Sequence, residues 1–110
     1  MQDTTWFKLP VKLLQQEELS LSAKVIYSYM LWRYNFFKKD NKQYFESQET
    51  VAQVCDVSRK TANEGIQKLC SLGWITAKKS TMQTSTYTVK DVFGVYTKRQ
   101  QGLPEEQEPF

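Results

Sequence analysis

Two short helical patterns joined by a three-residue turn constrain this chain more than any other feature of its sequence. Ser47 is a typical N-cap for a helix from Gln48 to about Cys55, whose inward residues are Val51, Ala52 and Cys55. Ser58 is the N-cap of the next helix, whose apolar residues recur at spacings of four, three and one and are Ala62, Ile66, Leu69 and Cys70. Because the turn is so short, we expect Ile66 to pack the second helix onto the first.

The turn itself predicts a sharp reversal of the chain. Ala52 is small enough for two helices to cross closely, and Asp56 stands four residues later, where Gly is usual. Asp enters the left-handed backbone region at modest cost, so it can take the place of that Gly. The two helices therefore have the spacing of a helix-turn-helix.

Helical and extended patterns also precede this pair. Residues 6–16 predict an extended lead-in and a turn of helix, with Pro10 at the first helical position. A long amphipathic helix follows, from an N-cap at Ser20 or Ser22 to about residues 38–41. Its predicted buried residues are Ala23, Ile26, Tyr27, Met30, Leu31, Tyr34 and Phe37. Residues 43–45 are a short strand candidate.

The segment after the helix pair predicts a β-hairpin. Gly73 lies just beyond the last helix, where a left-handed residue is needed. Residues 74–77 and 86–89 are rich in strand-forming side chains, and the polar stretch 78–85 between them is loop-like. We therefore predict an α+β winged helix-turn-helix, a three-helix core with a β-hairpin wing, over residues 5–95, followed by a flexible acidic tail at 98–110.

Composition excludes several classes of protein. A chain of 110 residues is one domain's worth, with 15 Lys and Arg against 12 Asp and Glu. The most apolar stretch, Val25 to Tyr34, is interrupted by Ser28 and Arg33 and falls short of the roughly 18 apolar residues that a membrane span needs. The N-terminus lacks the basic start and apolar run of a signal peptide. We expect a cytoplasmic protein with no membrane partner.

The residues that enzymes most often use are scarce. The chain has no His and only four Gly, so the commonest general base and a phosphate-cradling glycine loop are both missing. Cys55 and Cys70 are too few for a disulfide framework or a zinc site, and we expect them to be small buried thiols. We therefore expect no catalytic residue, no metal and no cofactor.

Four sequence motifs resemble the winged-helix domains of phage and plasmid replication proteins. They are Ser-Ala-Lys at residues 22–24, Ser-Gln-Glu-Thr-Val-Ala at 47–52, Val-Ser-Arg-Lys-Thr at 57–61 and Leu-Gly-Trp-Ile at 72–75. The resemblance covers about residues 7–93. It implies duplex DNA as the partner, in replication initiation or transcriptional control.

The outward face of the second helix of the pair carries side chains that read DNA bases. Arg can bond guanine, Asn or Gln can bond adenine, and Lys can contact phosphate when the helix enters the major groove. The predicted contact residues there are Arg59, Lys60, Thr61, Asn63, Glu64, Gln67 and Lys68. An ordinary solvated helix face would carry similar residues, but here they coincide with the turn motif.

Further DNA contacts are expected outside this helix. Lys78, Lys79 and Thr81 would lie on the wing, where they suit phosphates or the minor groove. Ser47 and Thr50 could donate to a phosphate at a helix N-terminus, although capping alone explains Ser47. Residues 1–97 carry a net charge of +4 and residues 98–110 a net charge of −1, so the positive excess belongs to the folded part.

The last six residues resemble the C-terminal tip of bacterial single-stranded-DNA-binding proteins, which docks on replication and repair partners. An acidic run precedes Pro-Phe here, although Glu and Gln replace Asp and the Ile before Pro is missing. The residues expected to bind a host replication protein are Glu105, Glu106, Glu108, Pro109 and Phe110. A solubilising acidic tail would have similar composition. The alternative to DNA binding is thus a protein-interaction module, and the sequence leaves open whether the chain forms a homodimer.

Overall fold

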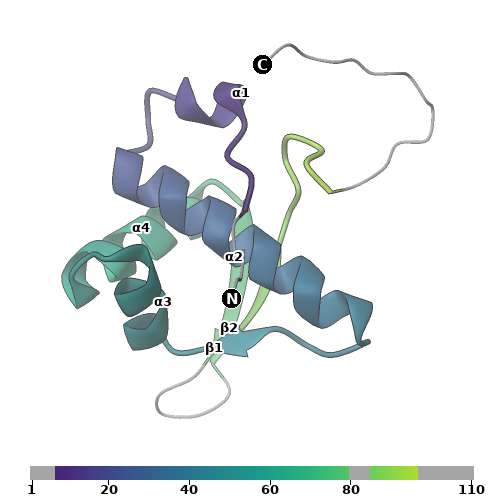
Figure 1. Cartoon of the computed structure of the whole chain (residues 1–110). Coiled ribbons are helices and arrows are strands. Elements are labelled where there is room, and N and C mark those ends of the chain that lie inside the picture. The colour runs from purple at the N-terminus through teal and green to yellow at the C-terminus, as the bar shows by residue number, and fades with distance from the viewer. Residues whose placement is uncertain (1–6, 80–84, 97–110) are drawn as a thin grey trace, which may run out of the picture.

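A computed structural model of the chain describes residues 7–79 and 85–96, so Trp6, Thr81 and the tail with its predicted partner site lie outside the described residues. The elements are α1 (Val11–Leu14), α2 (Leu21–Lys39), β1 (Phe45–Glu46), α3 (Gln48–Cys55), α4 (Arg59–Ser71), β2 (Ile75–Lys79) and β3 (Ser85–Val89). Figure 1 shows the long helix α2 at the centre, with α3 and α4 packed on one side of it and a small sheet beneath.

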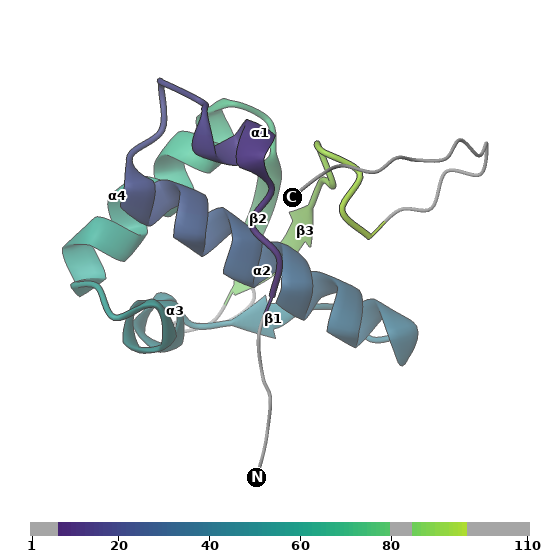
Figure 2. The same ribbon diagram turned by 45° about the horizontal axis from the view of Figure 1, so that its top comes forward.

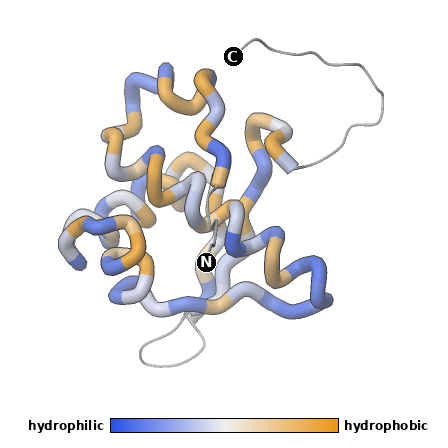
Figure 3. Tube along the Cα trace, in the orientation of Figure 1, coloured by the Kyte–Doolittle hydropathy of each residue, from blue (hydrophilic) through white to orange (hydrophobic). Residues whose placement is uncertain are grey.

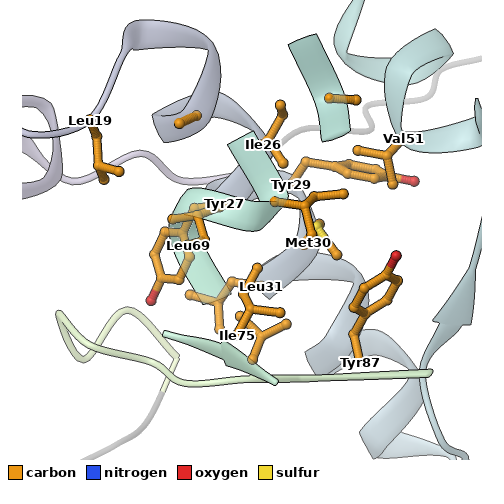
Figure 4. Packing of buried hydrophobic residues seen from close by; sticks show 14 of the residues in the cluster. Leu19, Ile26, Tyr27, Tyr29, Met30, Leu31, Val51, Leu69, Ile75 and Tyr87 are labelled. Carbon is orange, nitrogen blue, oxygen red and sulfur yellow. The ribbon is translucent and has the colours of Figure 1, made fainter. Parts of the chain in front are cut away.

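Helix α2 forms the centre of the core. It begins after Ser20, whose hydroxyl accepts a hydrogen bond from the Ala23 backbone N–H at 3.1 Å, which decides between the two predicted caps. Its middle is buried all round rather than on one stripe, since Ser28 and Tyr29 are buried as well as the predicted residues. Tyr34 and Phe37 are only partly buried. Figure 4 shows Ile26, Met30 and Leu31 of α2 among side chains from α3, α4 and the sheet.

The lead-in before α2 covers the additional buried face. The Phe7 ring packs against the rings of Tyr29 and Trp32, with 6.2 Å between centroids in each case. Leu13 of α1 is fully buried. Pro10 is the N-cap of α1 rather than its first helical residue, with φ −68° and ψ 149°. These contacts explain why α2 lacks an exposed stripe along its middle.

Three helices end in the same way, with one residue in the left-handed region. These residues are Asn41 after α2, Asp56 after α3 and Gly73 after α4, with φ of 58°, 59° and 79°. After α4 the Gly73 N–H bonds the Cys70 carbonyl and the Trp74 N–H bonds the Leu69 carbonyl, each at 3.0 Å. This double hydrogen bond is the Schellman arrangement that satisfies the last carbonyls of a helix. The predicted roles of Asp56 and Gly73 are confirmed.

The three strands form an antiparallel sheet in the order β1-β3-β2. Ile75 pairs with Val89, and both side chains are buried with Tyr87 between the sheet and α2. The hairpin is confirmed, but its strands are longer than predicted toward the loop and β2 begins one residue later, after Trp74. Lys78 and Lys79 belong to β2 and Ser85 to β3, so placing all three in the loop was wrong.

Tyrosine hydroxyls tie α2 to the sheet and to the chain after it. The Tyr27 hydroxyl donates to the Lys90 carbonyl and accepts from the Val92 N–H at 3.0 Å. Tyr29 donates to the Glu46 carboxylate at 2.7 Å, and Tyr44 donates to the other oxygen of the same carboxylate. The fold is therefore an α+β winged helix-turn-helix, as predicted, in which α2, α3 and α4 form the helical core.

Candidate nucleic-acid interface

The rotation of α4 is set by its buried face. Ala62, Ile66 and Leu69 are buried as predicted, and Gly65, which the hydrophobic pattern did not include, is buried beside them. A Cβ at Gly65 would stand 3.1 Å from Ile26 Cδ1 and 3.5 Å from Ala23 Cα, so α4 crosses the N-terminal half of α2 closely. Figure 2 shows α4 and α3 together on one side of α2. The opposite face of α4 is thereby turned to solvent.

That solvent face carries the predicted base-reading residues. Arg59, Lys60, Glu64, Gln67 and Lys68 are exposed and Asn63 is partly exposed. Lys60 and Glu64 form an ion pair at 4.0 Å with side chains 83% and 65% exposed, a geometry that leaves both free to exchange partners. With three cations against one anion, this face of α4 is positive.

The N-terminus of α4 is held by a side-chain cap. The Ser58 hydroxyl accepts from the Thr61 N–H at 3.0 Å and donates to the Thr61 hydroxyl at 3.0 Å. The Thr61 hydroxyl therefore accepts one hydrogen bond within the cap, and the residue is partly exposed. The cap fixes the first turn of α4, which carries Arg59 and Lys60.

The N-terminus of α3 is built in the same way. The Ser47 hydroxyl accepts from the Thr50 N–H at 3.1 Å, and the two hydroxyls lie 2.9 Å apart in a hydrogen bond. Both residues are partly buried. The two hydroxyls therefore already have partners inside the protein. For Ser47 this is the capping role that was the alternative to a phosphate contact.

The hairpin presents a polar outer face. Lys78 is exposed on β2, and the Thr86 hydroxyl of β3 donates to its carbonyl at 3.1 Å. Lys79 pairs with Ser85 in the same ladder. Thr76 and Thr88, opposite each other in the ladder, are also exposed, although the sequence pattern did not mark them as contact residues. The alternation of buried Tyr87 and Val89 with exposed Thr88 between them is the signal that could have identified this face.

The two thiols lack the environment of reactive cysteines. Both are partly buried rather than fully buried as predicted. Burial raises the pKa of Cys55 to about 11, with the Glu46 carboxylate adding to the effect, and burial also raises the pKa of Cys70. Both are therefore protonated thiols at neutral pH. Within residues 7–79 and 85–96 there is no cluster of three His, Cys, Asp or Glu side chains that could hold a metal ion.

An exposed polar helix held by a capped turn, beside a hairpin, defines the winged helix-turn-helix class. A family model described as "Helix-turn-helix domain" matches residues 17–75, more than half of the chain, so this chain belongs to that family. The matched range includes α2, α3 and α4. A comparison with curated proteins returned no match. Membership of this family supports DNA binding.

In the described part of the chain, none of the helices combines the length and the hydrophobicity that crossing a bilayer would require.

Proposed function

We propose that this protein binds double-stranded DNA sequence-specifically and that the N-terminal half of α4 enters the major groove. The observation that carries the proposal is the position of the exposed polar face of α4, which lies opposite the face buried against α2 and begins at a capped turn. In helix-turn-helix proteins the second helix of the motif contacts base edges in this way.

The side chains of α4 divide into two roles by their chemistry. Arg59 would bond guanine through two N–H donors, and Asn63 and Gln67 would bond adenine. Glu64 can accept from the amino group of cytosine once it leaves its ion pair with Lys60. Lys60, Lys68 and the Thr61 hydroxyl would contact phosphates and so set the position of the helix without reading sequence.

The wing and the start of α3 would contact the flanking backbone. Lys78 on β2 is exposed, and we assign it, with Lys79 and Thr81, to phosphate or minor-groove contacts. Ser47 and Thr50 would contact a phosphate beside the N-terminus of α3, where the helix dipole favours an anion. These contacts would hold α4 in register with its site.

The proposed biological setting follows from the replication-protein resemblance. We infer a role without catalysis in replication initiation or transcriptional control of a phage or plasmid, in the cytoplasm, with residues 5–95 as the DNA-binding domain. A homodimer would bind an inverted repeat, because half-site spacing mirrors the symmetry of the protein. Docking of residues 105–110 on a host replication protein is the alternative function, and it rests on the acidic Pro-Phe tip.

The salt dependence of duplex binding tests the proposal. The logarithm of the association constant should fall linearly with the logarithm of salt concentration, with a slope of about −0.9 for each phosphate contacted. Lys60→Ala and Lys68→Ala should each reduce the steepness of that slope by about 1. Lys12→Ala, which removes an exposed Lys from α1, is the matched control and should leave the slope unchanged.

Two results would contradict the proposal. One is the absence of duplex binding at low salt by the folded protein, as expected of a pure docking module. The other is a slope that changes equally in the Lys12, Lys60 and Lys68 variants, which would place the contact outside α4.

A further inference from the structure

An exposed aromatic patch lies at the C-terminal end of α2, whereas α4 crosses the N-terminal half of that helix. The patch consists of Phe36 and Phe37 on α2 and Phe45 on β1. Its β1 member borders the hairpin, because Phe45 pairs with Thr86 of β3. The Phe37 ring makes edge contacts with both others, at 6.5 Å from Phe36 and 5.7 Å from Phe45 between centroids. Phe36 and Phe45 are 52% and 53% exposed. A shallow pocket at this patch is lined by Phe36, Phe37, Asp40 and Lys42. Side chains of this size are rarely left half exposed in a group without a partner.

The guanidinium of Arg33 lies over two of these aromatic rings. The Arg33 guanidinium carbon is 5.2 Å from the Phe36 ring centre and 5.1 Å from the Phe37 ring centre. Arg33 Nε is buried and has no hydrogen-bond partner among the described residues. Among the described residues, no ion pair joins Arg33 to a carboxylate. The buried Nε is closed to an incoming ligand, so a carboxylate would pair with the terminal N–H groups of the guanidinium, for which it is the best partner.

Residues 38–42 directly follow Phe37 and form a positive rim, in which Lys42 lines the pocket while the Lys38 ammonium lies 5.7 Å from the Tyr34 ring centre. Lys38, Lys39 and Lys42 follow Arg33 along the chain, and Asp40 is the single acidic residue between positions 33 and 42. The nearby Glu46 carboxylate already accepts hydrogen bonds from Tyr29 and Tyr44. Figure 3 shows the hydrophilic end of α2 directly beside a hydrophobic stretch. The patch therefore suits a ligand that combines an aromatic ring with several carboxylates.

We infer that this surface binds an acidic peptide ending in an aromatic residue, and that its occupant is residues 105–110 of the same chain. That segment is Glu105-Glu106-Gln107-Glu108-Pro109-Phe110, with three carboxylates and one ring. In this proposal the Phe110 ring enters the pocket that Phe36, Phe37, Asp40 and Lys42 line. A Glu carboxylate meets Arg33, and the other Glu side chains lie among the lysines of the rim. The inference stands independently of the proposed DNA binding.

The length and position of the intervening chain allow this contact. In Figures 1 and 2 the yellow end of the described chain lies on the same side of the molecule as the C-terminal half of α2. Fourteen residues follow Tyr96. They span at most about 46–50 Å when extended, which exceeds the longest dimension of the structure, 44 Å. Tethering raises the effective concentration of the segment at its site, which favours its own domain over a second molecule.

Backbone and side-chain NMR of the full chain tests the inference. Replacing Phe110→Ala should shift the amide signals of Phe36, Phe37 and Lys42 and the Nε–H signal of Arg33. Leu103→Ala, an apolar change in the same tail outside the acidic segment, is the matched control and should leave those signals in place. Phe36→Ala should in turn shift the amide signals of Glu106, Glu108 and Phe110, while the signals of core residues report an intact fold.

The same NMR shifts, measured at raised salt and at several protein concentrations, distinguish the remaining outcomes. Raising the salt concentration to about 0.5 M should diminish the shifts caused by Phe110→Ala, because the carboxylates and the rim would be screened from each other. No change at Phe36, Phe37 or Lys42, or changes confined to α4 and the hairpin, would overturn the inference. Shifts that grow with protein concentration together with a doubled mass would overturn it too, because the occupant would then be a second copy.

Discussion

Gly65 of α4 and Ile26 of α2 meet so closely that the absent side chain of Gly65 sets the distance between the two helices. A Cβ at position 65 would lie 3.1 Å from Ile26 Cδ1, and Ile26 is itself fully buried. Because the proposed reading face is the opposite side of α4, this contact also determines how that face is presented. The orientation of α3 and α4, the helix pair predicted from its caps, thus depends on packing against α2.

The first prediction concerns this contact. Gly65→Ala adds the crowding Cβ, and Ile26→Val removes Cδ1, the atom that it would crowd. We expect the double variant to be more stable than the sum of the single changes implies, by about 0.5–1.5 kcal/mol. Urea unfolding of the four proteins measures this coupling. Strictly additive free energies of unfolding would show that the two residues do not meet as described.

The second prediction concerns the turn between α3 and α4. Asp56 adopts φ 59° and ψ 47°, which costs a side-chain-bearing residue energy and costs Gly none. We expect Asp56→Gly to raise the free energy of unfolding by a few tenths of a kcal/mol to about 1 kcal/mol, and Asp56→Val to lower it by about 1–2 kcal/mol. Thermal melts test both changes. Equal melting temperatures for the Gly and Val variants would contradict the left-handed conformation.

Much of the fold follows from local signals in the sequence. The caps Ser20, Ser47 and Ser58 and the left-handed positions Asp56 and Gly73 depend on residues within one or two turns of each helix end, so short-range chemistry predicts them. The local signals did not predict the features that depend on contacts between residues far apart in the chain. Tyr29 is buried because Phe7 covers it, and β1 is short because only two of its residues pair with β3.

The residues of the candidate site fall into the same two groups, those that local spacing predicts and those that depend on distant pairing. Helical spacing predicted which residues of α4 face outward, and the structure confirms that Arg59, Lys60, Glu64, Gln67 and Lys68 are exposed. Spacing did not predict the exposed threonines of the hairpin, because polar strand residues resemble loop residues until the pairing partner is known. The roles of these side chains toward DNA stay predictions.

The third prediction concerns pH. Burial raises the pKa of Tyr27 to about 12, above the value of about 10 expected in the unfolded chain. The folded state therefore holds this proton more tightly, so the resulting stability is complete below about pH 10 and is lost as the pH rises toward 12. In that window we expect Tyr27 to contribute a fall of about 1.4 kcal/mol per pH unit to the free energy of unfolding.

Tyr27→Phe isolates this contribution from that of the other buried tyrosines. The variant lacks the hydrogen bonds to Lys90 and Val92, so we expect it to be less stable by about 1–3 kcal/mol at pH 8. The difference from the wild type should shrink at pH 11, because only the wild type loses the Tyr27 contribution. Urea unfolding at both pH values gives the two differences. Equal differences at pH 8 and pH 11 would contradict the raised pKa.

The most direct test of the central claim is selection of binding sites from random duplexes with the wild type, Arg59→Ala, Asn63→Ala and Lys60→Ala. We expect the wild type to select one sequence motif and Lys60→Ala to select the same motif more weakly. Arg59→Ala and Asn63→Ala should each lose about 1–3 kcal/mol of discrimination at one base position while remaining folded. If both variants select the wild-type motif with undiminished preference at every position, α4 is not the element that reads DNA.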